Sequence, residues 1–192
     1  MIHKMALAIS LAAAAPASAA PVLEQVQAEA DGTTSLSHEV IVAAAPKDVW
    51  AAIATVEGWR SWAVPTAWVP ADQPDVFETS YNPAARPGDP MNIKNRFVAR
   101  IPGRLLVFHT IKAPEGFPHF AALRQVNQIF ELSPAGAGTR VRLTGTGYRD
   151  NEAGKAVLAF FKGGNRVSLE MLRERFASGP INWAERLRKP IK

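Results

Sequence analysis

One long helical pattern near the C-terminal end constrains the fold of this chain more than any other feature. Apolar and small residues recur at alternating steps of three and four positions between Leu158 and Phe176, and charged residues occupy the opposite side. This spacing predicts a single amphipathic helix from about Asn151 to Ser178, which the Gly179-Pro180 pair ends. A helix of this kind buries its apolar side against another layer of the fold.

The middle of this helix has an unusual composition for a side that packs on a core. Gly163 and Gly164 are adjacent, and each costs about 1 kcal/mol relative to alanine inside a helix. Asn165 and Ser168 occupy the centre of the side that is otherwise apolar. The residue pattern therefore predicts the helix but does not explain why its centre is small and polar.

The composition favours one globular domain with a hydrophobic core. The chain has 192 residues, of which 47% are hydrophobic and 20% are charged. It contains no cysteine, which excludes disulfides and a lipid anchor on a cysteine. Stability therefore has to come from packing alone.

The first residues have the pattern of a secretory signal. Lys4 precedes an apolar run, Met5 to Ala15, and Ala17-Ser18-Ala19 fits the small-residue cleavage pattern. We therefore expect a signal peptide over residues 1–19, a mature chain that begins at Ala20, and an exported protein, periplasmic or secreted. The run is shorter than the roughly 20 residues that cross a bilayer, so we expect no transmembrane segment. An alanine-rich extension or a wrongly assigned start is the alternative.

The positive charge is concentrated at the C-terminal end. The formal net charge is +5, and residues 162–192, the basic C-terminal end, contain eight basic and three acidic residues, 8 − 3 = +5. Glu170 and Glu174 lie at helical spacing from Arg166 and Arg173, which is typical of a solvated helix face. We expect no nucleic-acid partner and, at most, weak contact with an anionic surface.

Between the two ends the pattern alternates between strand and turn. Residues 20–34 have no clear period and are interpreted as a linker. Ser35–Val42 alternates like a strand, and the next residues have helical spacing from Pro46 until Gly58. A meander of about five strands follows from Asp75, with Pro102-Gly103 in a tight turn. This order predicts an α+β fold with about six strands.

This order, and four stretches in particular, resembles the SRPBCC superfamily, also called the START or birch-pollen-allergen fold. The stretches are APKDVWAAIATVEGWRSW, PGRLLVF, GTRVRLTGTGY and FFKGGNRVSLEMLRERF. The polyketide cyclase/dehydrase group and the domain of activators of the heat-shock ATPase chaperone are the most similar branches. The resemblance implies a helix-grip domain over residues 35–178, with a curved antiparallel sheet around the long helix, short helices after the first strand and a ligand cavity between sheet and helix. A basic tail with a short helix, residues 179–192, would follow.

The resemblance also suggests a reason for the small, polar centre of the helix. Gly164, Asn165 and Ser168 would cross the cavity, where small side chains leave volume and polar ones offer hydrogen bonds to a ligand. Gly163 would point outward. The alternative is that the glycine pair divides the helix into two pieces.

Strand periodicity then proposes which side chains enter the cavity. If Phe97, Val107 and Phe130 point inward, the two-residue period of a strand also turns four polar side chains inward. These are Asn95, His109, Arg124 and Gln128. Phe77 and Tyr81 are expected on the same side of the preceding strand. A mixture of aromatic and polar side chains suits an aromatic or lipid-like ligand with a carbonyl or carboxylate, without a cofactor. The predicted ligand site is Phe77, Tyr81, Asn95, Phe97, Val107, His109, Arg124, Gln128, Phe161, Gly164, Asn165 and Ser168.

Simple binding is the leading prediction, with two alternatives. A cyclase or aromatase reaction needs a base and a group that holds an enolate, and His109 with Arg124 could supply these. A protein-interaction domain could use the basic C-terminal end with Trp183. The sequence has no G-x-S-x-G motif, and its histidines show no metal-ligand spacing, so neither serine chemistry nor a metal site is expected.

Overall fold

The structure, a computed structural model, describes residues 20–188. The predicted signal peptide and the last four residues of the basic tail lie outside the described residues. No helix within residues 20–188 combines the length and apolar character that crossing a membrane requires.

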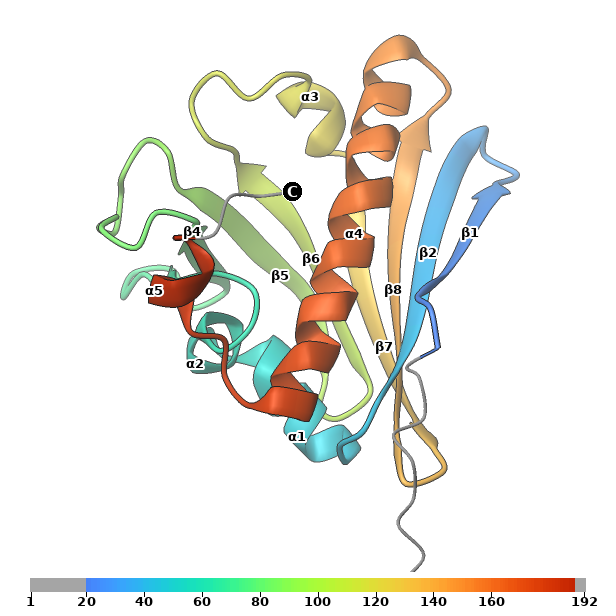
Figure 1. The fold of residues 1–192 in the computed structure, drawn as a ribbon. Coiled ribbons are helices and arrows are strands. Elements are labelled where there is room, and N and C mark those ends of the chain that lie inside the picture. The colour runs from blue at the N-terminus through green and yellow to red at the C-terminus, as the bar shows by residue number, and fades with distance from the viewer. Residues whose placement is uncertain (1–19, 189–192) are drawn as a thin grey trace, which may run out of the picture.

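The described strands form one antiparallel sheet around a long helix, which confirms the predicted helix-grip architecture (Figure 1). The strand order is β1-β2-β8-β7-β6-β5-β4-β3, so the sheet has eight strands and not about six. The strands are β1 (Leu23–Ala28), β2 (Thr33–Val42), β3 (Thr66–Trp68), β4 (Val76–Ser80), β5 (Ile93–Ile101), β6 (Leu105–Lys112), β7 (Asn127–Ala135) and β8 (Gly138–Arg149).

The expected linker at residues 20–34 is the main difference from the predicted organisation. Residues 23–28 form β1, which pairs antiparallel with β2 from Leu23 opposite Glu39 to Ala28 opposite Thr34. The strand cannot be recognised from its local sequence, because all its residues are exposed and its apolar residues do not alternate with polar ones. Its strand conformation depends on the ladder with β2.

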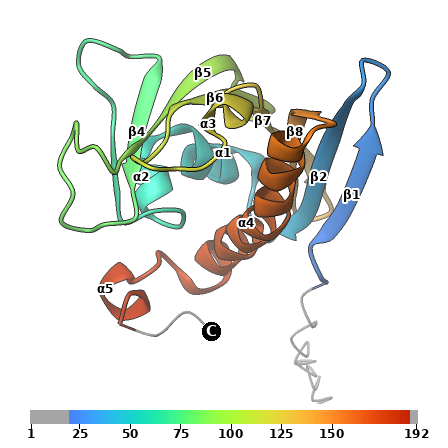
Figure 2. The ribbon, with the colours of Figure 1, turned by 90° about the horizontal axis from the view of Figure 1, so that it is seen from above.

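The helix α4 (Glu152–Ser178) lies across the concave face of the sheet. Seen from above, the sheet bends around it, with β1 and β2 on one side and β4 and β5 on the other (Figure 2). The Asn151 side chain caps its start by accepting a hydrogen bond from the Gly154 amide at 2.8 Å, and Gly179, with φ of 90°, ends it. The predicted bounds of the long helix therefore agree closely with the structure.

The described residues also contain four shorter helices. Pro46 stands in the first turn of α1 (Pro46–Ala54), whose Val49, Ala52 and Ile53 are buried. The others are α2 (Val56–Arg60), α3 (Phe120–Leu123) and α5 (Trp183–Arg186). The α5 segment is held beside α2, since the Trp183 indole donates to the Arg60 carbonyl at 2.7 Å.

The core consists of two clusters, and α4 belongs to both. Leu169 and Leu172, in the second half of α4, pack with Ile53, Phe77 and other residues of α1 and the sheet. Val157, in its first half, packs in the second cluster, which contains Leu36, Leu123, Val126 and Tyr148. The helix is thus fixed to the sheet at two places, and its small, polar centre lies between them.

A buried carboxylate fixes the irregular segment between β4 and β5. Glu78 is 1% exposed, and its Oε1 accepts from the Gly88 amide at 2.7 Å and from Asn92 Nδ2 at 2.6 Å. The Lys94 ammonium lies 3.7 Å from the other oxygen. These bonds hold the segment that follows Tyr81.

Candidate ligand-binding cavity

A cavity of about 330 Å³ lies between α4 and the concave face of the sheet. It receives side chains from both core clusters, so it occupies the place where α4 passes from one to the other. Most of its lining is apolar. The lining residues are Trp59, Trp62, Ala63, Val64, Thr79, Tyr81, Ile93, Asn95, Phe108, Thr110, Ala113, Pro114, Phe117, Leu123, Gln128, Phe130, Leu143, Phe160, Phe161, Asn165 and Ser168.

Two tryptophans make a fixed wall of the cavity. Trp59 donates its indole N–H to the Ile53 carbonyl at 2.6 Å, and Trp62 donates to the Ala52 carbonyl at 2.9 Å. Their ring centroids are 5.3 Å apart, and Trp59 also meets Phe108 edge-on at 5.9 Å. Both indole N–H groups already donate to carbonyl oxygens of α1, so this wall presents aromatic surface to the cavity and no free hydrogen-bond donor.

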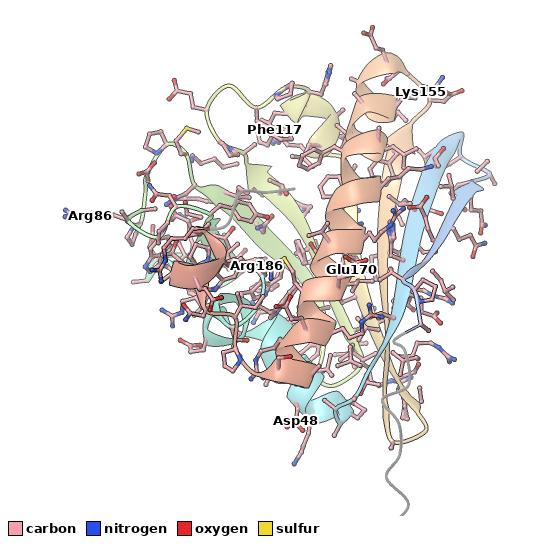
Figure 3. All side chains as sticks on the ribbon, viewed as in Figure 1. Asp48, Arg86, Phe117, Lys155, Glu170 and Arg186 are labelled. Carbon is pink, nitrogen blue, oxygen red and sulfur yellow. The ribbon has the colours of Figure 1, made fainter. Side chains whose placement is uncertain are left out.

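The opening of the cavity is marked by two exposed aromatic residues. Tyr81 is 65% exposed and Phe160 is 58% exposed, although both line the cavity. The ring of Phe117 packs edge-on against Phe160 at 5.7 Å, and Phe117 lies near the start of α4, where Lys155 is labelled (Figure 3). The opening is therefore framed by aromatic side chains from three separate segments.

The polar groups of the cavity are carboxamides and hydroxyls. Thr110 donates to Asn95 Oδ1 at 2.9 Å, and both residues are buried. Gln128 and Asn165 differ from this pair: Nε2 and Oε1 of Gln128 and Nδ2 of Asn165 are buried without a hydrogen-bond partner among the described residues. Ser168 and Thr79 add hydroxyl groups to the lining. The cavity thus holds unused hydrogen-bonding capacity.

Behind Gln128 lies a buried tyrosine. Tyr148 is 1% exposed, and its hydroxyl packs against Gly145, where a Cβ atom would collide with it. Burial raises the pKa of Tyr148, and the nearby Gln128 side chain opposes this only in part, without meeting the hydroxyl in hydrogen-bond geometry. Tyr148 therefore stays a neutral hydroxyl at physiological pH.

Among the described residues that line the cavity there is no aspartate, glutamate, lysine, arginine or histidine. Tyr81, at the exposed opening, is the one titratable side chain of this described lining. General acid–base catalysis needs a titratable group within reach of the reacting atoms. The described lining residues supply apolar surface and neutral hydrogen-bonding groups inside the cavity, and no charged side chain.

The structure brings six of the twelve predicted site residues into the cavity lining. They come from β5, β7, α4 and the end of β4: Tyr81, Asn95, Gln128, Phe161, Asn165 and Ser168. Phe77 and Phe97 face the same side of the sheet but pack on each other at 4.7 Å, behind Trp59. They line a separate hollow of about 180 Å³, in which Arg100 covers the Phe97 ring at 3.4 Å.

Val107 and His109 were assigned to the wrong face of β6. The buried residues of this strand are Leu106, Phe108 and Thr110, so Val107 and His109 point to the opposite side. The apolar run Leu105–Phe108 gives no alternation from which to read the faces. Two irregularities in the pairing of β5 with β6 also break the simple two-residue period.

Arg124 was assigned to a strand that begins later in the structure. It is an exposed residue at the end of α3, and β7 starts only at Asn127. Its guanidinium lies 5.8 Å from the Phe120 ring, outside the cavity lining. The proposed base His109 and cation Arg124 are therefore both absent from the lining, and the pairing that a cyclase reaction would need is not formed there.

The glycine pair does not divide α4, but it does not line the cavity either. The helix is continuous through Gly163 and Gly164, and neither has a positive φ. Both are exposed, and a Cβ atom on either would meet nothing within 4 Å. The prediction that Gly164 faces the cavity is wrong, because the inward row of the helix runs through Phe161, Asn165 and Leu169.

Sequence reasoning missed several lining residues. Phe108 and Thr110 would have followed from the correct faces of β6. Trp59, Trp62 and Phe117 come from irregular or short helical segments, whose side-chain directions no simple period reports. Their aromatic character was the only available signal.

Most of the basic C-terminal end is engaged within the molecule. Lys162 and Arg166 contact Glu24, and Arg186 contacts Glu174 at 2.9 Å. Arg175 donates to Ser61, while Arg173 and Arg188 donate to backbone carbonyls. Lys189 and Lys192 lie outside the described residues. Within residues 20–188 there is also no group of three acidic, histidine or cysteine side chains placed to hold a metal ion.

A long C-terminal helix gripped by a curved antiparallel sheet defines the helix-grip class, which agrees with the family comparison. Residues 33–177 match the family model described as "Polyketide cyclase / dehydrase and lipid transport". The chain belongs to this family, within the SRPBCC superfamily. A search of curated proteins found no match.

Solved structures show the same fold at low sequence identity. The Aha1 dimer from Colwellia psychrerythraea has a TM-score of 0.59 at 16% identity, over 76% of this chain and 97% of that chain. CalU16 from Micromonospora echinospora has a TM-score of 0.55 at 18% identity, over 87% of this chain and 88% of that chain. At these identities the likeness establishes the fold alone.

Proposed function

We propose that this protein binds a small hydrophobic ligand, aromatic or lipid-like, non-covalently in the cavity between sheet and α4. The observation that carries the proposal is a largely apolar cavity of about 330 Å³, whose described lining residues include a few polar groups and no charged one. Known ligand sites are hollows of roughly 300–1,000 Å³ with apolar walls and a small number of placed polar groups. The cavity lies at the lower end of this range, which favours a small ring system over a long acyl chain.

Binding without chemistry is favoured over a cyclase or aromatase activity. His109 and Arg124, the candidates for catalysis, are not among the lining residues, and no other described residue places a titratable side chain inside the cavity. A role as a protein-interaction domain gains no support from α5, since Trp183 already donates its indole N–H to Arg60.

Export is part of the proposal. Its support is the sequence pattern of Lys4, the apolar run Met5 to Ala15 and the Ala17-Ser18-Ala19 cleavage pattern. N-terminal sequencing of protein recovered from the export compartment tests it. The expected first residue is Ala20, and a chain that still starts with Met1 on most molecules would refute export by this signal.

The binding proposal is tested with the neutral fluorescent probe N-phenyl-1-naphthylamine and by native mass spectrometry of the purified protein. We expect saturable probe binding and a co-purified small molecule that competes with the probe. The His109→Gln variant should bind the probe as the unchanged protein does. Failure of the folded protein to bind any apolar probe would overturn the proposal, and a pH-dependent activity that is lost in His109→Gln would favour the catalytic alternative.

A further inference from the structure

From the polar groups of the cavity we infer the charge class of the ligand: an uncharged molecule that presents a carbonyl or carboxamide to Gln128 and Asn165, with carboxylates excluded. The inference rests on the proposed function, since it describes the ligand of the same cavity. From the sequence alone we expect a ligand that bears either a carbonyl or a carboxylate, whereas the cavity excludes the carboxylate.

Two carboxamides in the cavity have hydrogen-bonding atoms that no described residue uses. Gln128 is 6% exposed on the sheet side of the cavity, and Asn165 is 4% exposed on α4, so the two stand on different walls. Neither Nε2 nor Oε1 of Gln128, nor Nδ2 of Asn165, has a hydrogen-bond partner among the described residues. Most buried polar groups in proteins are hydrogen-bonded. A ligand that bonds to both carboxamides would use hydrogen-bonding groups that no described residue occupies.

The carboxamides determine which kinds of ligand group can form hydrogen bonds in the cavity. A carboxamide has an N–H₂ donor and a carbonyl acceptor, so it complements a ligand group that accepts, donates or does both. Asn95 extends the set: its Oδ1 already accepts from Thr110, which leaves its N–H₂ group as a donor. A ligand carbonyl meets donors here, and a ligand amide or hydroxyl also meets the acceptors.

The described lining of the cavity carries no charged side chain. A carboxylate buried there would lose its hydration and find no cationic partner among the described lining residues. Burial of an ionised group without a partner is strongly unfavourable, so the group avoids the site or takes up a proton. The neighbouring Tyr148 does not change this, because burial raises its pKa and keeps it neutral. The cavity therefore discriminates against charged ligands although none of its described lining residues is charged.

The placement of these groups gives the ligand an orientation. Tyr81 and Phe160, at the opening, are more than half exposed, whereas Gln128 and Asn165 are buried. The polar end of the ligand thus reaches the interior and its ring system lies between the tryptophan wall and the aromatic opening.

The test uses three naphthalenes that differ only in one substituent: 2-naphthamide, 2-naphthoate and 2-methylnaphthalene. Displacement of the fluorescent probe at pH 7.5 reports the affinity of each. We expect 2-naphthamide to bind at least tenfold more tightly than 2-naphthoate. Equal affinity for 2-naphthamide and 2-naphthoate, or tighter binding of 2-naphthoate, would overturn the inference and leave the proposed function intact. If 2-methylnaphthalene and the probe also fail to bind, the proposed function itself fails.

Variants assign the discrimination to the two carboxamides. Gln128→Met and Asn165→Leu should each weaken 2-naphthamide binding about tenfold and leave 2-methylnaphthalene binding unchanged or stronger. Asn127→Leu is the matched control, because Asn127 precedes Gln128 in β7 and does not line the cavity. Unchanged 2-naphthamide binding in both folded variants would contradict the assignment. The ligand series on the unaltered protein decides the charge class even if a variant does not fold.

Discussion

The Glu24 carboxylate of β1 lies 3.0 Å from the His38 imidazole of β2, Oε2 to Nε2. The same oxygen accepts from Arg166 of α4 at 3.0 Å, and the Lys162 ammonium lies 3.6 Å from the other oxygen. One carboxylate therefore joins the edge strand, its neighbour and the long helix. His38 is fully buried, so Glu24 is also the partner that satisfies a buried ring nitrogen.

This relationship predicts that β1 contributes to stability although its side chains are exposed. Glu24→Ala removes the partner of the buried His38 nitrogen and the contacts with α4, so it should lower the free energy of unfolding by about 1 to 3 kcal/mol. Urea unfolding measures this. Gln25→Ala, the next residue of the same exposed strand, is the control and should change the value by less than about 0.5 kcal/mol. Equal effects of the two substitutions would show that β1 is held by its backbone alone.

The same pair predicts that acid destabilises the fold in two steps. Burial lowers the pKa of His38 below its ordinary 6.5, despite the opposing effect of Glu24. The unfolded chain then binds a proton more readily than the folded one, so stability falls as the pH drops below about 6.5. The hydrogen bond from Arg166 lowers the pKa of Glu24, so its contribution is present above about 4.5 and is lost as the pH falls further.

Unfolding curves between pH 8 and pH 5 test the first step, with His38→Gln as the comparison. We expect stability to decline towards pH 5 in the unchanged protein and to decline less in the variant, whose side chain does not titrate. A parallel decline in both would assign the acid sensitivity to other groups.

A helix or strand could be predicted from the sequence only where its apolar residues repeat with a regular local period. The long helix was predicted almost to the residue because its apolar side repeats from Leu158 to Phe176. The strand β1 was missed because its structure comes from pairing with β2 and from Glu24, which meets α4 residues far along the chain. No local pattern reports such contacts.

Whether a cavity residue could be predicted also depended on whether its segment has a clear local period. Asn165 and Ser168 were identified because polar residues stood out against an apolar helix side. His109 was misplaced because β6 is apolar on both faces over its first residues, so the period that assigns faces was absent there. The irregular pairing of β5 and β6 is a tertiary property, and a sequence pattern cannot place it.

A single substitution on α4 can fill part of the cavity. Ser168 lines the cavity, whereas its neighbour Val167 is 49% exposed on the outside of the helix. Ser168→Phe should fill part of the roughly 330 Å³ and weaken binding of the neutral fluorescent probe at least tenfold. Val167→Phe adds a ring one position away and should leave binding within about twofold. Similar binding in both folded variants would place the probe outside this cavity.

The basic C-terminal end should give only weak contact with anionic membranes. Its described basic side chains contact carboxylates, a hydroxyl or backbone carbonyls of the same chain, as the contacts of Arg186 and Arg175 illustrate. Flotation with vesicles of phosphatidylglycerol and phosphatidylcholine should show some binding at low salt and none near physiological salt, where charges are screened over about 8 Å. Pure phosphatidylcholine vesicles are the control. Binding that persists at physiological salt would promote a membrane-associated role.

The glycines of α4 differ in their surroundings, and this predicts opposite effects of alanine. Gly163 and Gly164 are exposed, helical and free of neighbours within 4 Å of a Cβ atom. Alanine at either position should stabilise the protein by about 0.5 to 1 kcal/mol, because it has the higher helix propensity and restricts the unfolded chain. Thermal melting of the two single variants measures the gain.

Gly154 in the first turn of the same helix provides the contrast. It is buried, and a Cβ atom there would collide with the backbone oxygen of Arg149, so one of the two segments has to move. Gly154→Ala should therefore destabilise the protein by about 1 to 3 kcal/mol, the range for overpacking a well-packed site. A loss of stability in the Gly163 and Gly164 variants as well would mean that the helix is not continuous at its centre. A gain in those two beside a loss at Gly154 would agree with a helix that is continuous at its centre and tightly packed at its start.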